Sequence, residues 1–235
     1  MSRAHRRALL IGLLAVLIGA IAVLAVRQRT PAERPRLLLL TSLPIVFGED
    51  FSVQHNGSPA LDALQRHYQV VPISTAAAPE LAKGRLLLMA QPLGQAPQDL
   101  VALDDWVRSG GRVLILADPF LEWPSDRPLG DPQRPPPTFV DTGLLGHWGL
   151  RLDAPDQRGP KRLHLGGYSI EVVSPGVLSG RCAISANRLS ARCNIGKGRA
   201  TVVADADLLD VADLSPDASE NLKGLLAELA TLGQE

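Results

Sequence analysis

Five polar residues stand where predicted buried strands end, and their types make them the best candidates for chemistry. Ser42, Gln91 and Asp118 follow three apolar runs, and Asp205 and Asp207 follow a fourth. Ligands bind outside the carboxyl ends of the strands in a parallel sheet, so these side chains are predicted to line a ligand edge. Carboxylates in such a place suit a divalent cation.

Two interpretations of the three aspartates stay open. They could converge on one cation around an open cleft, which would place them within about 6 Å of one another. Alternatively, each accepts hydrogen bonds from the backbone of its own turn. Asp118 precedes a proline, and Asp205 or Asp207 can cap a short helix at LLDVAD. The second interpretation is favoured, and no metal or cofactor is predicted.

Nucleophilic catalysis has little support. It requires Ser or Cys on a tight strand-to-helix turn with a His base in reach. No G-x-S-x-G motif occurs, and Gln91-Pro92 stands where a nucleophile would be expected. His147 and His164 are interpreted as partly exposed polar residues. No catalytic residue, and no enzyme activity, is therefore predicted.

The two cysteines could form a disulfide. Cys182 and Cys193 lie on either side of a turn-prone Ala-Asn-Arg at residues 186–188. A hairpin at that turn would bring the thiols opposite each other, within bridging distance. Disulfides persist in oxidising compartments, so the pair favours a place outside the cytoplasm. Two unrelated free thiols are the alternative.

Residues 8–26 form an apolar run without a charge or a proline, and a helix of this length spans roughly 28 Å, enough to cross a lipid bilayer. Residues 1–7 are predicted to be a cytoplasmic basic leader, and residues 27–35 a linker. A signal peptide cleaved near residues 20–22 and a buried soluble helix are the alternatives. We expect a single-pass signal-anchor in a bacterial inner membrane, with residues 36–235 as one periplasmic domain.

Charge argues against a nucleic-acid partner. The chain holds 24 Lys and Arg against 24 Asp and Glu, and five of the arginines lie before Thr30 with no acid among them. The remainder is therefore acidic and offers no electrostatic attraction to a phosphate backbone. Aromatic residues make up only 4% of the chain, which disfavours an aromatic sugar cleft.

The candidate residues are positioned by an alternation of apolar runs and amphipathic segments. Apolar throughout, the runs predict strands buried on both faces, hence a parallel sheet covered by helices on both sides. Helix signals are Ser58-Pro59 and Pro97 at starts, Gly110-Gly111 at an end, and Ser215-Pro216 before a leucine-rich terminal helix. Strands are predicted at residues 36–43, 68–73, 85–90, 112–117 and 198–204.

Two segments depart from this alternation. Residues 118–140 are rich in proline and fit no regular element, so they predict a long loop, either a surface insertion or a partner-binding segment. Residues 144–152 predict a short helix that turns at Gly149 into a strand. Residues 162–193 hold short strand-like runs joined by Gly, Ser and Asn turns, and are predicted to form a small antiparallel appendage.

Two motifs carry a family resemblance. LDDWVRSGGRVLILADP (residues 103–119) and GKGRATVVADADLLD (residues 196–210), with a leucine-rich last helix, resemble the periplasmic auxiliary component of uncharacterised ABC-type transport systems, the group that includes the gliding-motility protein GldG. The resemblance covers about residues 36–232. It implies an α/β, flavodoxin-like or class I glutamine amidotransferase-like three-layer fold without the catalytic cysteine. The chain is shorter than those relatives and has one N-terminal span.

The resemblance implies a function. The expected role is a membrane-anchored, non-catalytic periplasmic accessory or binding domain beside an ABC transporter. Its expected partners are the lipid bilayer, through residues 8–26, and permease or ATPase subunits. The alternatives are a degenerate or unrecognised hydrolase, or a small-ligand sensor domain, using the strand-end aspartates.

Overall fold

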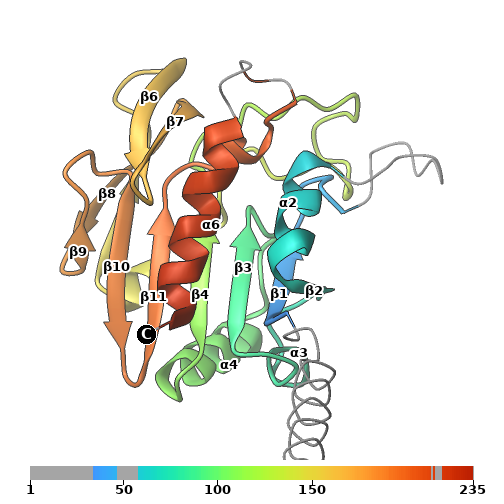
Figure 1. The fold of residues 1–235 in the computed structure, drawn as a ribbon, viewed down its shortest axis with the longest axis vertical. Coiled ribbons are helices and arrows are strands. Elements are labelled where there is room, and N and C mark those ends of the chain that lie inside the picture. Colours follow the sequence, from blue (N-terminus) through green and yellow to red (C-terminus); the bar gives the residue numbers. More distant parts are fainter. Residues whose placement is uncertain (1–33, 47–57, 213, 215–218, 235) are drawn as a thin grey trace, which may run out of the picture. The chain divides into compact units, whose positions relative to one another are not determined.

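Five parallel strands form the centre of the protein in a computed structural model that describes residues 34–46, 58–212, 214 and 219–234. The sheet order is β2-β1-β3-β4-β11, with a further antiparallel part at one edge (Figure 1). Every neighbouring pair among the five is parallel, as the apolar runs predict. The strands are β1 (Arg36–Thr41), β2 (Gln69–Pro72), β3 (Leu86–Ala90), β4 (Arg112–Leu116) and β11 (Gly198–Val203).

The predicted antiparallel appendage is wrong in its extent. Strand β10 (Ser190–Ile195) pairs with β11, and β9 (Ala183–Ile184) pairs with β10. The two strands enlarge the main sheet to seven strands. In the described part of the chain, two small two-stranded sheets stand apart from the main sheet. One pairs β5 (Leu150–Asp153) with β8 (Val177–Gly180), and the other pairs β6 (Pro160–Leu165) with β7 (Tyr168–Val173). The predicted appendage ends at residue 193, whereas β10 continues to Ile195 and pairs with the next strand, β11, across a two-residue turn.

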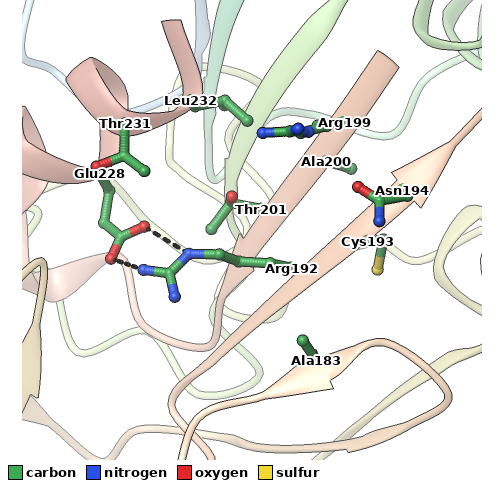
Figure 2. Close-up of a pocket in the computed structure, with 10 residues that line it drawn as sticks. All are labelled: Ala183, Arg192, Cys193, Asn194, Arg199, Ala200, Thr201, Glu228, Thr231 and Leu232. Atoms are coloured by element: carbon green, nitrogen blue, oxygen red, sulfur yellow. Dashed lines mark hydrogen bonds and ion pairs between the residues drawn. The ribbon is translucent and has the colours of Figure 1, made fainter. Parts of the chain in front are cut away.

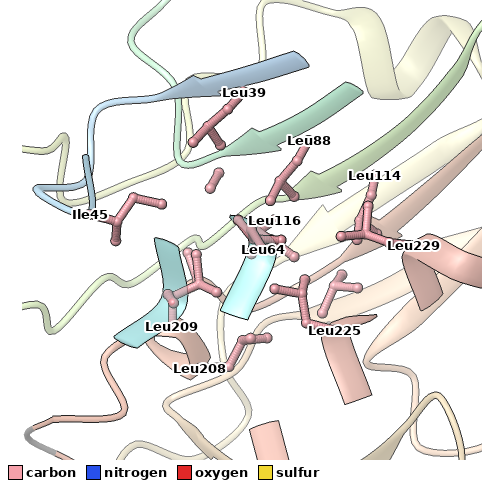
Figure 3. Packing of buried hydrophobic residues seen from close by; sticks show 14 of the residues in the cluster. Leu39, Ile45, Leu64, Leu88, Leu114, Leu116, Leu208, Leu209, Leu225 and Leu229 are labelled. Atoms are coloured by element: carbon pink, nitrogen blue, oxygen red, sulfur yellow. The ribbon is translucent and has the colours of Figure 1, made fainter. Parts of the chain in front are cut away.

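Helices cover both faces of the sheet, and two separate cores explain the unbroken apolar runs. In β1, Leu37 and Leu39 pack in one core, while Leu38 and Leu40 pack in the other. Both faces of a covered parallel sheet are dry, so every position of such a strand is apolar. The first core lies under α2 (Pro59–His67) and α6 (Ser219–Gln234), and Figure 3 shows its leucines. The second lies under α4 (Pro97–Arg108) and α5 (Leu144–His147), with the short α3 (Ala78–Leu81) nearby.

The predicted helix signals act as expected where the structure describes them. The Ser58 side chain accepts a hydrogen bond from the backbone N–H of Leu61 at 3.1 Å, which caps α2. After α4, Gly110 adopts a φ of +115° and its N–H bonds to the carbonyl of Val107. A Cβ on Gly111 would lie 2.3 Å from the Trp106 ring, so this chain reversal requires glycine.

Some predictions fall outside the described residues. The structure does not describe four of the predicted segments in full: the leader, the apolar run at residues 8–26, most of the linker at residues 27–35, and the Ser215-Pro216 cap. Among the helices that the structure describes, none combines the length and apolarity needed to cross a bilayer. The stretch from Asp118 to Val140 contains no helix or strand, as its prolines predict.

Candidate functional site

Gln91 connects the ends of two central strands. It follows β3 with a φ of +41° and is fully buried. Its side-chain Oε1 accepts a hydrogen bond from the N–H of Asp118 at 2.9 Å, and its Nε2 donates to the carbonyls of Asp118 at 3.2 Å and Pro136 at 3.0 Å. This amide holds the start of the proline-rich segment against the sheet and has no group that could act as a nucleophile.

Ser42 joins the same network from β1. Its hydroxyl donates to the carbonyl of Gln91, while Thr41 donates to the carbonyl of Ala90 at 2.8 Å. The chain runs from β1 to β2 on one side and reaches β3 on the other, so Ser42 and Gln91 flank the point where the strand order reverses. This is the position at which open α/β sheets bind ligands.

Asp118 and Asp205 are both completely buried, and backbone N–H groups bind all four of their carboxyl oxygens. Asp118 accepts from Phe120 at 2.8 Å and from Ala206 at 2.9 Å. Asp205 accepts from Leu208 at 2.8 Å and from Val173 at 3.0 Å, and it thereby begins the short 3-10 helix η1 (Asp207–Leu209). These two carboxyl groups organise the turns around them.

Burial raises the pKa of both groups. The pKa of Asp118 is raised to about 6, chiefly because its carboxyl is removed from water. The pKa of Asp205 is raised well above its ordinary value by burial and by the neighbouring Asp118 and Asp207 charges. The backbone N–H donors lower both values but do not offset the loss of water.

Asp207 differs from its two neighbours. It is 3% exposed, and one of its oxygens, Oδ2, accepts from the backbone N–H of Glu122 at 2.9 Å. Within the part of the chain that the structure describes, its Oδ1 has no hydrogen-bond donor. Burial and the nearby Asp118 charge raise the pKa of Asp207 to about 7. Burial thus favours the protonated form of this carboxyl near neutral pH.

Glu122 brings an exposed carboxylate to the same place. It comes from the proline-rich segment, and its Oε1 accepts a hydrogen bond from the Ser174 hydroxyl. Ser174 is buried, has a φ of +48° and also accepts from the N–H of Gly159 at 2.8 Å. Sequence reasoning missed Glu122 and Ser174, because neither stands at the end of a predicted core strand. The two residues are also 52 positions apart, so nothing local in the sequence connects them.

All five predicted edge residues thus lie at one end of the sheet. Hydrogen bonds connect Ser42 to Gln91, Gln91 to Asp118, and Asp118 to the backbone beside Asp205 and Asp207. Across the described residues, no group of three His, Cys, Asp or Glu side chains is placed to hold a metal ion. The raised pKa of Asp207 and its hydrogen bond to the backbone of Glu122 make proton transfer the chemistry that this edge suits best.

The two histidines lie elsewhere. His147 is on α5, where its Nε2 is 3.4 Å from Asp104 Oδ2 and 3.1 Å from the Arg108 guanidinium. His164 is exposed on β6, and its carbonyl accepts from Asn187. Neither contacts the strand-end acids.

Cys182 and Cys193 form a disulfide bond. Cys193 lies on β10, and Cys182 directly precedes β9, so the bridge joins the outermost antiparallel strands of the main sheet. The turn between them includes Arg188, which has a φ of +58°. Asn187 Oδ1 accepts from the N–H of Leu189 at 3.2 Å and stabilises that turn.

No family model and no curated protein matches this chain. Solved structures of similar fold include the exo-β-1,4-mannosidase Op5Man5 from Opitutaceae bacterium strain TAV5, at a TM-score of 0.52, 14% identity, and coverage of 87% of this chain and 37% of that one. The GH42 β-galactosidase Gan42B of G. stearothermophilus matches at a TM-score of 0.50 and 14% identity, with coverage of 85% of this chain and 30% of that one. The cytoplasmic protein STM1381 of Salmonella typhimurium LT2 matches at a TM-score of 0.51 and 13% identity, with coverage of 84% of this chain and 99% of that one. The chain spans about a third of each glycosidase.

These comparisons correct the family prediction. Solved structures that share the fold include glycosidases and the Salmonella protein, and these are not GldG-like domains. The glutamine amidotransferase-like fold label is corrected with it, and no helix among the described residues supplies the predicted transmembrane span. The motif behind the label, helix-Gly-Gly-strand-Asp-Pro, fits the general needs of a parallel α/β sheet: a left-handed helix end and a strand-end turn. It therefore cannot identify a family.

Three further predictions are corrected on the same findings. The prediction of a non-catalytic ABC accessory without enzyme activity is contradicted by the solved structures of similar fold, which include glycosidases at 14% identity. The predicted inner-membrane, periplasmic location is contradicted as well: no helix among the described residues could cross a membrane, and the Salmonella protein of similar fold is itself described as cytoplasmic. The predicted contacts of residues 8–26 with a bilayer, and of the domain with transporter subunits, are tested by none of these observations and stay predictions.

Proposed function

We propose that this chain is a hydrolase-type domain that acts on glycosides, with Asp207 as the proton donor and Glu122 as the second carboxyl group. One observation carries the proposal: a buried acid with a pKa of about 7 adjoins an exposed carboxylate at the ligand edge of a parallel sheet. The mannosidase and the β-galactosidase of similar fold support the substrate class.

Glycoside hydrolysis needs two carboxyl groups in different protonation states. One protonates the oxygen of the leaving group, and the other attacks the sugar or activates a water molecule on its opposite face. Proteins separate the two roles by environment, keeping a buried carboxyl protonated beside a hydrated one. Asp207 and Glu122 differ in their environment, since the first is 3% exposed and the second is exposed.

The neighbouring acids prepare Asp207 for this role. Asp118 and Asp205 have both oxygens bound by backbone N–H groups, so they stay in place. The Asp118 charge raises the pKa of Asp207 and favours its protonated form. In the reaction, Asp207 gives its proton to the glycosidic oxygen as the carbon–oxygen bond breaks, and water supplies the hydroxyl that ends on the sugar. A proton released from that water restores Asp207.

The segment around Glu122 controls access to Asp207. Leu121 donates its N–H to the carbonyl of Pro137 at 3.0 Å, and Leu121 and Trp123 pack against the core under α2 and α6. Glu122 lies between them and is exposed, while its Oε1 accepts a hydrogen bond from the buried Ser174 hydroxyl. Contact with Asp207 requires the segment of residues 120–123 to move outward.

The test measures release of p-nitrophenol from p-nitrophenyl β-mannoside and β-galactoside by the full chain. We expect turnover that falls by at least about 100-fold in Asp207→Asn and in Glu122→Gln, in line with the usual contribution of acid–base groups. Asp105→Asn, an exposed acid on α4, is the matched control and should keep full activity. Absence of turnover in the unmodified chain, or full activity in Asp207→Asn, would overturn the proposal.

A further inference from the structure

A second polar site lies on the α6 side of the sheet, away from the strand-end acids. Strands β10 and β11 pair so that Arg192 stands opposite Thr201, and Asn194 opposite Arg199. Side chains alternate between the two faces of a strand, so these four point to one face. With Glu228 and Thr231 of α6 they line a pocket of about 260 Å³, shown in Figure 2.

An ion pair fixes one wall of this pocket. The Glu228 side chain is 1% exposed, and its Oε1 accepts from the N–H of Gly166 at 3.0 Å and from Arg192 Nη2. Its Oε2 accepts from Arg192 Nε at 3.3 Å. The Arg192 side chain is 53% exposed and extends across the pocket to reach its partner (Figure 2). A guanidinium has five N–H donors, so this pairing leaves others for a ligand.

Thr201 supplies an independent sign of a ligand. It is 2% exposed and lines the pocket, yet its hydroxyl has no hydrogen-bond partner among the residues that the structure describes. A buried polar group without a partner costs about 1–3 kcal/mol, and native proteins rarely keep one without a reason. The exposed Asn194 amide beside it likewise has no partner within the described ranges.

Charge and shape select the ligand. The Arg192 guanidinium keeps N–H donors beyond its pairing with Glu228, and it lines the pocket together with the Asn194 amide and the Thr201 hydroxyl. Leu232 and Ala183 provide apolar surface beside them. A guanidinium with an amide and a hydroxyl matches the oxygens of a carboxylate, and Leu232 and Ala183 match a short hydrocarbon chain.

We propose that this pocket binds a small organic monocarboxylate, whose oxygens accept hydrogen bonds from Arg192, Asn194 and Thr201 while its hydrocarbon part contacts Leu232. The site shares no residue with the Asp207–Glu122 pair, so the two proposals stand or fall separately.

Titration of the full chain with butyrate, followed by backbone amide NMR shifts, tests the proposal. We expect saturable shifts at Asn194 and Thr201. Thr201→Val, which keeps the shape and removes the hydroxyl, should weaken butyrate binding about tenfold, or 1.4 kcal/mol. Its melting temperature should not fall, because the lost hydroxyl had no protein partner. Thr142→Val, on an exposed loop, is the matched control and should bind butyrate normally.

Three outcomes would overturn the proposal. The first is absence of saturable shifts with butyrate. The second is binding of inorganic phosphate in preference to butyrate, which would indicate a tetrahedral anion. The third is unchanged butyrate affinity in Thr201→Val, which would show that the hydroxyl does not contact the ligand. A clear loss of stability in that variant would also count, because it would show that the hydroxyl serves the fold.

Discussion

The side chain of Gln91 binds both backbone polar groups of Asp118. The Gln91 Oε1 accepts from the backbone N–H of Asp118 at 2.9 Å, and the Gln91 Nε2 donates to the backbone carbonyl of Asp118 at 3.2 Å. The two residues end neighbouring strands, so the amide continues the sheet beyond its last backbone pair. It also fixes the place where the proline-rich segment begins, through the carbonyl of Pro136.

Removing this amide should destabilise the protein. We expect Gln91→Leu to lower the free energy of unfolding by roughly 3 kcal/mol, because it leaves the buried N–H of Asp118 without its partner. Urea denaturation measures the change, and Gln98→Leu, at an exposed position of α4, should stay within about 0.5 kcal/mol of the unmodified chain. Equal stability of the two variants would show that the amide network contributes little.

Stability should fall as the pH rises through the range between the unfolded and folded pKa values of the buried acids. The pKa of Asp118 is raised to about 6 and that of Asp207 to about 7 in the folded protein. At intermediate pH the folded chain holds protons that the unfolded chain has released. The contribution of these two groups to the free energy of unfolding is therefore greatest below about pH 4 and is lost by about pH 7.

Urea midpoints between pH 5 and pH 8 measure this dependence. We expect a loss of at least about 2 kcal/mol over that range, since one pKa unit corresponds to about 1.4 kcal/mol. Asp207→Asn cannot ionise and should show a shallower slope than the unmodified chain. A flat profile, or a rise in stability with pH, would mean that the buried carboxyls are not protonated at mild acidity.

Close packing at the start of β11 should make one glycine irreplaceable. A Cβ on Gly198 would lie 2.0 Å from the carbonyl oxygen of Val107 and 2.2 Å from that of Gly111. Gly198→Ala must therefore push β11 away from the end of α4, at a cost of roughly 2–4 kcal/mol.

Gly146 on α5 gives the comparison, because an added Cβ there meets nothing within 4 Å. Gly146→Ala should leave the melting temperature unchanged or raise it, since alanine favours a helix over glycine. Thermal melts of the two variants separate the steric effect from the general effect of replacing glycine. Similar melting temperatures would contradict the packing described at Gly198.

The disulfide should stabilise the outer edge of the main sheet. Cys182 and Cys193 are 11 positions apart, and a cross-link that closes a loop of this size contributes about 3 kcal/mol by restricting the unfolded chain. Reductant should lower the melting temperature of the unmodified chain. The double variant Cys182→Ala and Cys193→Ala should melt at that lower temperature with or without reductant, and an effect of reductant on it would exclude the disulfide as the cause.

The sequence by itself determined which segments form the centre of the sheet. The run at residues 36–43 is apolar at every position because β1 is covered on both faces, and this local property requires no knowledge of the partner. The Ser58 cap and the Gly110-Gly111 helix end are equally local, since each depends on a few neighbouring backbone groups. The strand-end positions of Ser42, Gln91 and the three aspartates followed from those strands.

Only the tertiary structure decided how distant residues meet. Asp207 acquires its raised pKa from burial and from Asp118, and its neighbour Glu122 arrives from a segment 85 residues away that has no regular structure. Arg192 and Glu228 meet because β10 joins β11 and α6 crosses them, although nothing local in β10 distinguishes an edge of the main sheet from a separate hairpin. Backbone propensity and apolar pattern act over a few residues, whereas desolvation and ion pairing depend on the packed whole.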